Sequence, residues 1–106
     1  TVYEVLPVNM EPLRLTRFEC GGIVYALKQQ LMVEVDYRDE LWVYHSSLIN
    51  LWGSGGRRED ALRDLHENFA YLWREFAEED DAVLDEKAKQ IKRTLLEITE
   101  HESVGV

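Results

Sequence analysis

The spacing of apolar residues changes once along this chain, and that change is the feature that most narrowly limits the fold. Between positions 32 and 52, short runs alternate apolar with polar or combine β-branched with aromatic residues, as in strands. From position 62 onward, apolar residues recur every three or four positions, which is typical of an amphipathic helix. The order predicts an α+β domain, with a sheet packed against the helices that follow it.

Three consecutive strands are predicted in the first region. Val33, Val35 and Tyr37 fall on one side of a strand that begins at Met32, and polar residues fall largely on the other. Residues 38–40 form a polar turn before the strand-favouring residues 41–45. Residues 48–52 are expected as the next strand, ended by the glycine-rich run 53–56. Because only short turns join these strands, we expect an antiparallel meander of three or more strands.

Two amphipathic helices are predicted after the glycines. The apolar stripe of the first consists of Leu62, Leu65, Phe69, Leu72 and Phe76. The stripe of the second consists of Leu84, Ala88, Ile91, Leu95 and Ile98. The acidic run 78–81 is expected to end the first helix and to cap the second. A short loop between them predicts antiparallel packing, and the loss of pattern from Thr99 predicts a frayed tail.

The first 31 residues are the hardest to interpret. Val2–Val8 and Leu13–Phe18 are candidate strands, and Cys20-Gly21-Gly22 is a candidate turn. Residues 23–31 fit either a strand or a helical turn, because a short apolar run does not decide between them. The length of 106 residues and the 45% hydrophobic content predict a single domain spanning residues 1–106.

The charge balance limits the class of partner. The formal net charge is -9, and a negative potential repels phosphate backbones and anionic lipid surfaces. We therefore expect no direct nucleic-acid partner and no membrane partner, whereas a basic protein fits the charge. Cys20 is the only cysteine, and no apolar run resembles a signal or a membrane span, so a cytoplasmic location is expected.

No motif indicates catalysis or a bound cofactor. Cys20, His45, His66 and His101 are too far apart for the paired spacing of zinc sites. The acidic residues from 78 to 86 lack the alternation of a calcium loop, and residues 53–56 lack both phosphate-loop signatures. We therefore expect no enzymatic activity, no metal and no cofactor. One alternative stays open, a small hydrolase that uses His45 or His66 as a base with a nearby carboxylate.

Two sets of residues are candidates for contact with a protein partner. Trp42 and Tyr44 share one predicted strand; if they lie on the outer sheet face, that face is either covered by residues 1–31 or offered to another protein. The second set is an acidic loop, which is solvated in most proteins of this kind but would suit a basic partner. It consists of Glu78, Glu79, Asp80 and Asp81.

The central part of the chain resembles the HicB-like antitoxin domain over about residues 31–76. The resemblance lies in Leu41-Trp42-Val43-Tyr44-His45 and in Leu51-Trp52-Gly53-Ser54-Gly55-Gly56-Arg57-Arg58-Glu59-Asp60-Ala61-Leu62. That family has an aromatic strand, a strand ending in a glycine turn, and Glu-Glu-Ala-Leu opening a helix. Gly55 corresponds to the turn glycine, and residues 59–62 correspond to the helix opening.

The resemblance implies a ribonuclease-H-like β-β-β-α fold that has lost its catalytic carboxylates. A protein of this family binds and covers a small basic toxin ribonuclease. For this chain it implies structural roles for Gly55 at the turn and for Ala61 and Leu62, which would pack the helix on the sheet. Gly53 and Gly56 are further structural candidates at the turn and helix start.

A second hypothesis is a self-associating accessory or scaffold protein of phage or plasmid origin. Its aromatic sheet face or its helical stripe would close a homodimer, since small two-fold dimers are common.

Overall fold

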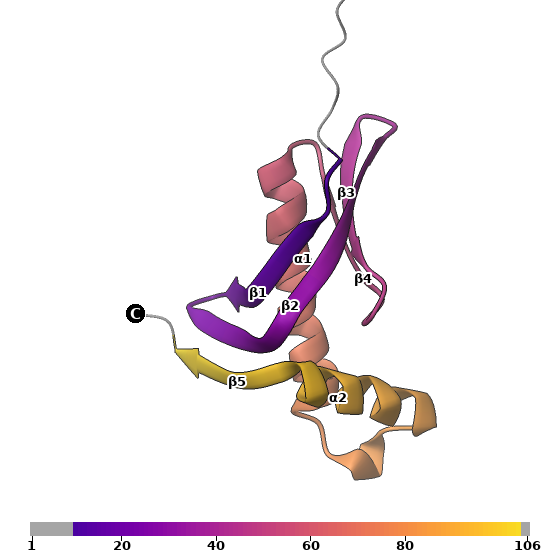
Figure 1. Cartoon of the computed structure of the whole chain (residues 1–106). Coiled ribbons are helices and arrows are strands. Elements are labelled where there is room, and N and C mark those ends of the chain that lie inside the picture. Colours follow the sequence, from indigo (N-terminus) through magenta and orange to yellow (C-terminus); the bar gives the residue numbers. More distant parts are fainter. Residues whose placement is uncertain (1–9, 105–106) are drawn as a thin grey trace, which may run out of the picture.

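The computed structural model describes residues 10–104 and shows an α+β fold, as predicted (Figure 1). A four-strand antiparallel meander is followed by two helices that pack against the sheet. The strands are β1 (Leu13–Cys20), β2 (Ile23–Arg38), β3 (Leu41–Ser46), β4 (Leu51–Gly55) and β5 (Thr99–Val104). The helices are α1 (Arg58–Leu72), a π-helical continuation of it, η1 (Trp73–Ala77), a short 3-10 turn, η2 (Asp81–Val83), and α2 (Glu86–Ile98).

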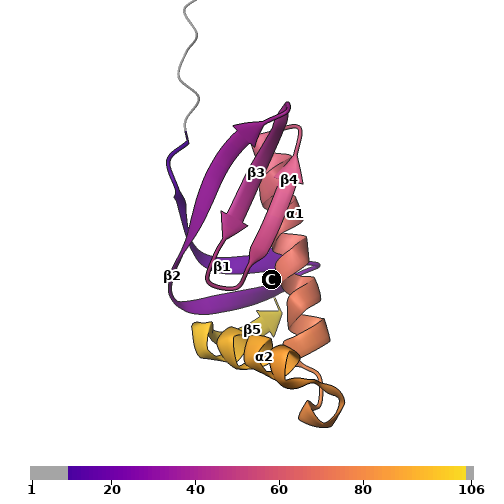
Figure 2. The same ribbon diagram turned by 90° about the vertical axis from the view of Figure 1, so that its right-hand side faces the viewer.

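Strand β2 organises the sheet, because it pairs with three other strands. β1 lies along one side of β2, while β3 pairs with the second half of its other side and β5 with the first half. The register between β1 and β2 shifts at Thr16. Leu15 pairs with Leu31 and Arg17 pairs with Ala26, so that residues 27–30 of β2 lie opposite Thr16 alone. β2 bends in its middle, and the two halves of the sheet curve around α1 (Figures 1 and 2).

The structure decides one open prediction and corrects two others. Residues 23–31, which fitted either a strand or a helical turn, are strand, so the strand predicted from Met32 is the second half of a longer one. Residues 48–50 are part of a turn, because Asn50 adopts a left-handed backbone (φ 48°) and its N–H donates to Ser47 O over 3.4 Å. The predicted frayed tail is wrong over residues 99–104, which form β5 because the first half of β2 offers them a free edge. The predicted strand Val2–Val8 lies outside the described residues.

The glycines of the Gly53–Gly56 run have different roles, and only part of the run is a turn. Gly53 and Gly55 lie within β4 and face α1, so the prediction that the run breaks the strand at Gly53 is wrong. A Cβ atom on Gly53 would lie 2.5 Å from Ala61 O and 2.6 Å from Leu65 N. A Cβ atom on Gly55 would lie 2.8 Å from Ala61 N. The two glycines therefore allow the helix backbone to rest directly on the strand.

The core forms where α1 crosses the curved sheet. Phe18 of β1 stacks on Phe69 of α1, with ring centroids 4.1 Å apart, and Tyr25 packs edge-on against Phe69 at 5.3 Å. The core-facing buried residues of α1 and η1 include Ala61, Leu65, Phe69, Trp73 and Ala77. The predicted stripe is correct at Leu65 and Phe69, while its other members are only partly buried at the flank. Helix α1 places Ala61 against β4, because the two backbones lie so close at Gly53 and Gly55 that a larger side chain has no room there.

The two helices do not pack antiparallel. Helix α2 lies across the end of α1 and packs against η1 and β5 (Figures 1 and 2). The turn η2 separates them, and its N-cap is Asp80, whose carboxylate accepts from Ala82 N. The cap of α2 is Asp85, which accepts from Ala88 N over 2.8 Å, so the predicted acidic run 78–81 caps the 3-10 turn instead of the helix.

We expect Gly53→Ala to destabilise the fold by about 3 kcal/mol, because its Cβ would overlap with rigid helix backbone and force α1 away from β4. The free energy of unfolding in urea measures this loss. Gly56→Ala is the matched control, since a Cβ there meets no atom within 4 Å and the backbone is not left-handed. Equal stabilities for the two variants would contradict the close-approach role of Gly53.

Candidate functional site

The face of the meander that points away from α1 is the candidate site. Because successive side chains of a strand alternate between faces, the contact of Gly53 with α1 directs Trp52 and Ser54 to the opposite face. The strand register then places Glu34, His45 and Trp52 in one cross-strand row. We call this surface the outer face; it consists of Met32, Glu34, Asp36, Arg38, Leu41, Val43, His45, Trp52 and Ser54, with Arg14 beside Met32.

The outer face combines exposed apolar side chains with charges. Met32 and Trp52 are each 47% exposed, and Leu41 is exposed on the neighbouring strand. Residues 13–31 extend the sheet as β1 and the first half of β2, and they do not lie over the outer face. Contiguous apolar patches are typical of surfaces that contact another protein, and these separate exposed apolar groups make the outer face a candidate for such contact.

Two rings on the outer face are held in one arrangement. The imidazole of His45 stacks on the indole of Trp52, with centroids 3.7 Å apart and planes 21° apart. Trp52 Nε1 donates to Asn50 Oδ1 over 3.1 Å, and His45 Nε2 lies 3.4 Å from the same oxygen. The turn before β4 therefore fixes both rings.

The predicted contact residues Trp42 and Tyr44 lie on the helix-facing side of the sheet and not on the outer face. Tyr44 is only 4% exposed, and its burial raises the pKa of its hydroxyl above 10.0 while Arg58 opposes the rise. Trp42 packs against the core, and the guanidinium of Arg58 lies 4.4 Å from its ring centroid. Both side chains serve the contact between sheet and helix.

The acidic loop is folded back on α2. Lys92 Nζ donates to Glu79 O over 2.6 Å and forms an ion pair with Asp81 at 2.8 Å. The hydrogen bond and the charge of Lys92 lower the pKa of Asp81. Glu79 Oε1 accepts a hydrogen bond from the backbone N–H of Asp80, and Asp80 is the N-cap residue of η2. Three of the four predicted contact residues, Glu79, Asp80 and Asp81, thus order the loop internally; Glu78 joins the loop through its backbone N–H to Trp73 O.

Helix α1 protects both edges of the meander. At β1, His66 Nδ1 accepts from Glu19 N over 2.9 Å. At β4, Asp64 Oδ2 accepts from Ser54 N over 2.9 Å, and Asn68 Nδ2 donates to Trp52 O over 2.7 Å. Side chains on opposite flanks of one helix thus occupy backbone groups that would otherwise pair with another strand.

His66 has a structural role in this arrangement. It lines a hollow of about 550 Å³ between β1 and α1, together with Arg17, Glu59 and Arg63. Its Nδ1 lone pair is engaged by Glu19 N–H, so it cannot take a substrate proton without losing that bond. His45 lies on the outer face, so the two alternative candidate bases are on different surfaces of the protein.

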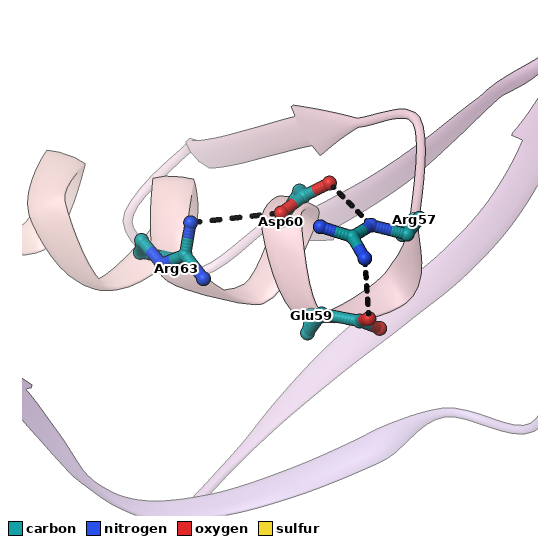
Figure 3. A network of polar contacts seen from close by, with 4 residues as sticks. All are labelled: Arg57, Glu59, Asp60 and Arg63. Carbon is teal, nitrogen blue, oxygen red and sulfur yellow. Dashed lines mark hydrogen bonds and ion pairs between the residues drawn. The ribbon is translucent and has the colours of Figure 1, made fainter.

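The start of α1 neutralises its own charges (Figure 3). Asp60 pairs with Arg57 at 3.2 Å and with Arg63 at 3.6 Å, and Arg57 lies 3.7 Å from Glu59. Glu59 and Asp60 lie in the first turn of α1, and their negative charges disfavour an anion at this helix N-terminus.

Among the described side chains, those of residues 10–100, no group of three His, Cys, Asp or Glu side chains could hold a metal ion. In the same part of the chain, no helix has the length and apolar character to cross a bilayer.

Comparison with known proteins leaves the family open. No family model matches the chain, and it has no significant match among curated proteins or solved structures. The resemblance to the HicB-like domain therefore stays a prediction.

The outer-face residues Trp52 and Met32 were missed as contact candidates from sequence. The signal that could have found them is the pair Gly53 and Gly55, two positions apart. Two glycines on one face of a strand indicate that this face touches another backbone, and the residue between or beside them points outward.

We expect His66 to make stability depend on pH. Burial lowers its pKa below 6.5, with Glu19 partly opposing, so the unfolded chain binds the proton more readily than the folded one. The contribution of neutral His66 to the free energy of unfolding is fully present above pH 6.5. It is lost as the pH falls through that value toward the lowered pKa of the folded state. Asn offers an oxygen near the position of Nδ1 without titrating, so His66→Asn should lose less stability over this range.

Urea unfolding of both proteins from about pH 7.5 to pH 5.5 measures the difference. The other histidines are present in both proteins, so their effect on the pH dependence cancels when the two profiles are compared. Parallel pH profiles would show that His66 does not cause the dependence.

Proposed function

We propose that this protein is a non-catalytic binding protein whose outer face covers a small basic protein, in the manner of an antitoxin that neutralises a toxin ribonuclease. The observation that carries the proposal is the outer face itself, with Met32 and Trp52 exposed on a sheet whose other face packs on α1. The cytoplasm is the proposed location, because the lone Cys20 is free and suits a reducing compartment.

Charge supports a basic partner. The chain has a net charge of -9, and four of its carboxylates lie in the hairpin of β2 and β3, those of Glu34, Asp36, Asp39 and Glu40. Asp36 pairs with Arg38 at 2.8 Å, which leaves the hairpin strongly acidic. Such a surface accelerates encounter with a basic protein and disfavours acidic ones.

The protected edges support binding through the face. A partner that added a strand to β4 would displace the bonds of Asp64 and Asn68, and one that added to the end of β1 would displace His66. Each displaced group would have to find a new partner or lose its bond. The outer face requires no such exchange.

Self-association is the second candidate function, and it rests on the mixed charge of the outer face. Arg14 and Arg38 lie on the same surface as Glu34 and Asp36. A two-fold dimer pairs a surface with itself, so charges of both signs on that surface can form complementary contacts.

We expect the double variant Met32→Ser, Trp52→Ser to lose a basic partner captured from native extract at low salt. The captured protein should be released as salt is raised, since screening weakens an electrostatic encounter. Its affinity for the purified double variant should fall at least about tenfold, because exposed aromatic anchors carry much of an interface's energy. Calorimetry with the purified partner measures this change.

Tyr71→Ser, Leu96→Ser is the matched control, since these side chains are similarly exposed (55% and 44%) but lie on α1 and α2. Equal losses in the two double variants would refute binding through the outer face. Recovery of the chain alone, as a dimer that only the outer-face variant dissociates, would support self-association instead.

A further inference from the structure

A second hollow lies on the helix side of the molecule. The turn that joins β3 to β4 faces α2 (Figures 1 and 2), and the space between that turn, α2 and the end of α1 with η1 is a hollow of about 470 Å³. None of its lining residues belongs to the outer face, and it shares none with the hollow at His66. It is therefore a separate candidate for a binding site.

Helix α2 turns one of its faces toward this hollow. The lining residues from α2 are spaced three and four positions apart, so they follow one another along a single face. They are Lys87, Gln90, Ile91 and Thr94. Lys89 lies on another face of the helix, where it lines a different hollow beside the acidic loop.

The wall of the hollow is mainly apolar. Leu72, Phe76 and Ile91 are only partly buried, although each also packs against the core. Ile49 has the same character on the side of the turn. Leu48 stands at the rim and is 61% exposed. An apolar group in the hollow would remove area of these side chains from water without displacing any core residue.

Lys87 carries the only charge among the lining residues. The chain has twenty-one acidic residues and twelve basic ones, so a hollow with one cation and no carboxylate departs from the average surface. Lys89 of the same helix pairs with Glu86 at 3.6 Å. Lys87, by contrast, forms no ion pair with a carboxylate of residues 10–100. Its ammonium group is thus available to a ligand.

These features select the chemical class of the ligand. A hollow of this volume falls within the range of small-molecule sites, which are apolar with a few polar groups that fix orientation. One ammonium group balances one carboxylate, and the Ser47 hydroxyl and the Gln90 amide add neutral donors at the same hollow. A phosphate dianion would leave an excess of negative charge on a protein that already carries -9.

We propose that this hollow binds a small amphipathic monocarboxylate, with its apolar chain against Phe76 and Ile91 and its carboxylate at Lys87. The site is independent of the proposed function, because the outer face contributes no residue to it.

The test is a titration of the intact chain with octanoate, followed in nitrogen-15 spectra at about 0.15 M salt, where long-range repulsion is screened. We expect saturable shifts of the backbone signals of residues 47–50 and 87–94, with half-saturation on the order of 1 mM. The signals of residues 38–41, in the turn between β2 and β3, should not move. Octanamide, which has the same chain without the charge, should bind about threefold more weakly, and octylammonium more weakly still.

Two pairs of variants test the charge and the apolar wall. Lys87→Gln should weaken octanoate binding about threefold and remove the preference for octanoate over octanamide. Lys89→Gln is its matched control, because it removes the same charge from another face of α2. Leu48→Ser should weaken binding about fivefold through lost apolar contact. Val83→Ser is the control for that change, since Val83 is 69% exposed and does not line the hollow.

The outcomes that would overturn the site are distinct from those that bear on the outer face. Absence of saturable shifts up to about 10 mM octanoate, shifts spread over the whole chain, or equal binding of octanoate and octylammonium would overturn the proposal. So would equal effects of Lys87→Gln and Lys89→Gln. Capture of a basic partner, and its loss in the Met32, Trp52 double variant, tests the proposed function alone.

Discussion

The approach of helix α1 to strand β4 at Gly53 and Gly55 is the contact on which the remaining architecture depends. It brings the backbone of Ala61 and Leu65 onto the strand, at distances that any Cβ on Gly53 would violate. Once the helix lies that close, its rotation is fixed, and Leu65 and Phe69 reach the core formed with Phe18. Close packing of this kind makes a protein interior stiff, so the helix transmits its position to both edges of the sheet.

The same rotation decides which surfaces remain available. It places Asp64 and Asn68 at the edge of β4 and His66 at the edge of β1. Free strand edges invite non-specific pairing, and their occupation by side chains limits that risk. The outer face is left as the broad surface with exposed apolar groups, and the turn at Asn50 orders the aromatic pair on it. The availability of this face for the proposed binding is thus a consequence of how the helix packs on the sheet.

Some carboxylates of the protein form ion pairs that order nearby segments, whereas most of those in the β2–β3 hairpin do not. The acidic loop around Asp81 is held by Lys92, and the carboxylates at the start of α1 pair with Arg57 and Arg63. Exposed ion pairs of this kind contribute little stability, commonly below about 1 kcal/mol each, but they do fix where segments lie. The carboxylates of the β2–β3 hairpin have one arginine partner among them, Arg38. An acidic hairpin beside exposed Met32 and Trp52 fits the proposed basic partner.

The sequence by itself determined the fold class, the strand alternation around Val33 and Val35, and the first helix with its core residues Leu65 and Phe69. These follow from local periodicity, which depends only on the geometry of one strand or one helix. Tertiary structure decided the strand β5, the turn at residues 48–50, the crossing of α2 over α1, and the face on which Trp42, Tyr44 and Trp52 lie. Each of these depends on a partner distant in the sequence. The sequence of a strand does not show which of its faces will be covered by another element. Here the contact of α1 with the glycines of β4 buried Tyr44 and left Trp52 exposed.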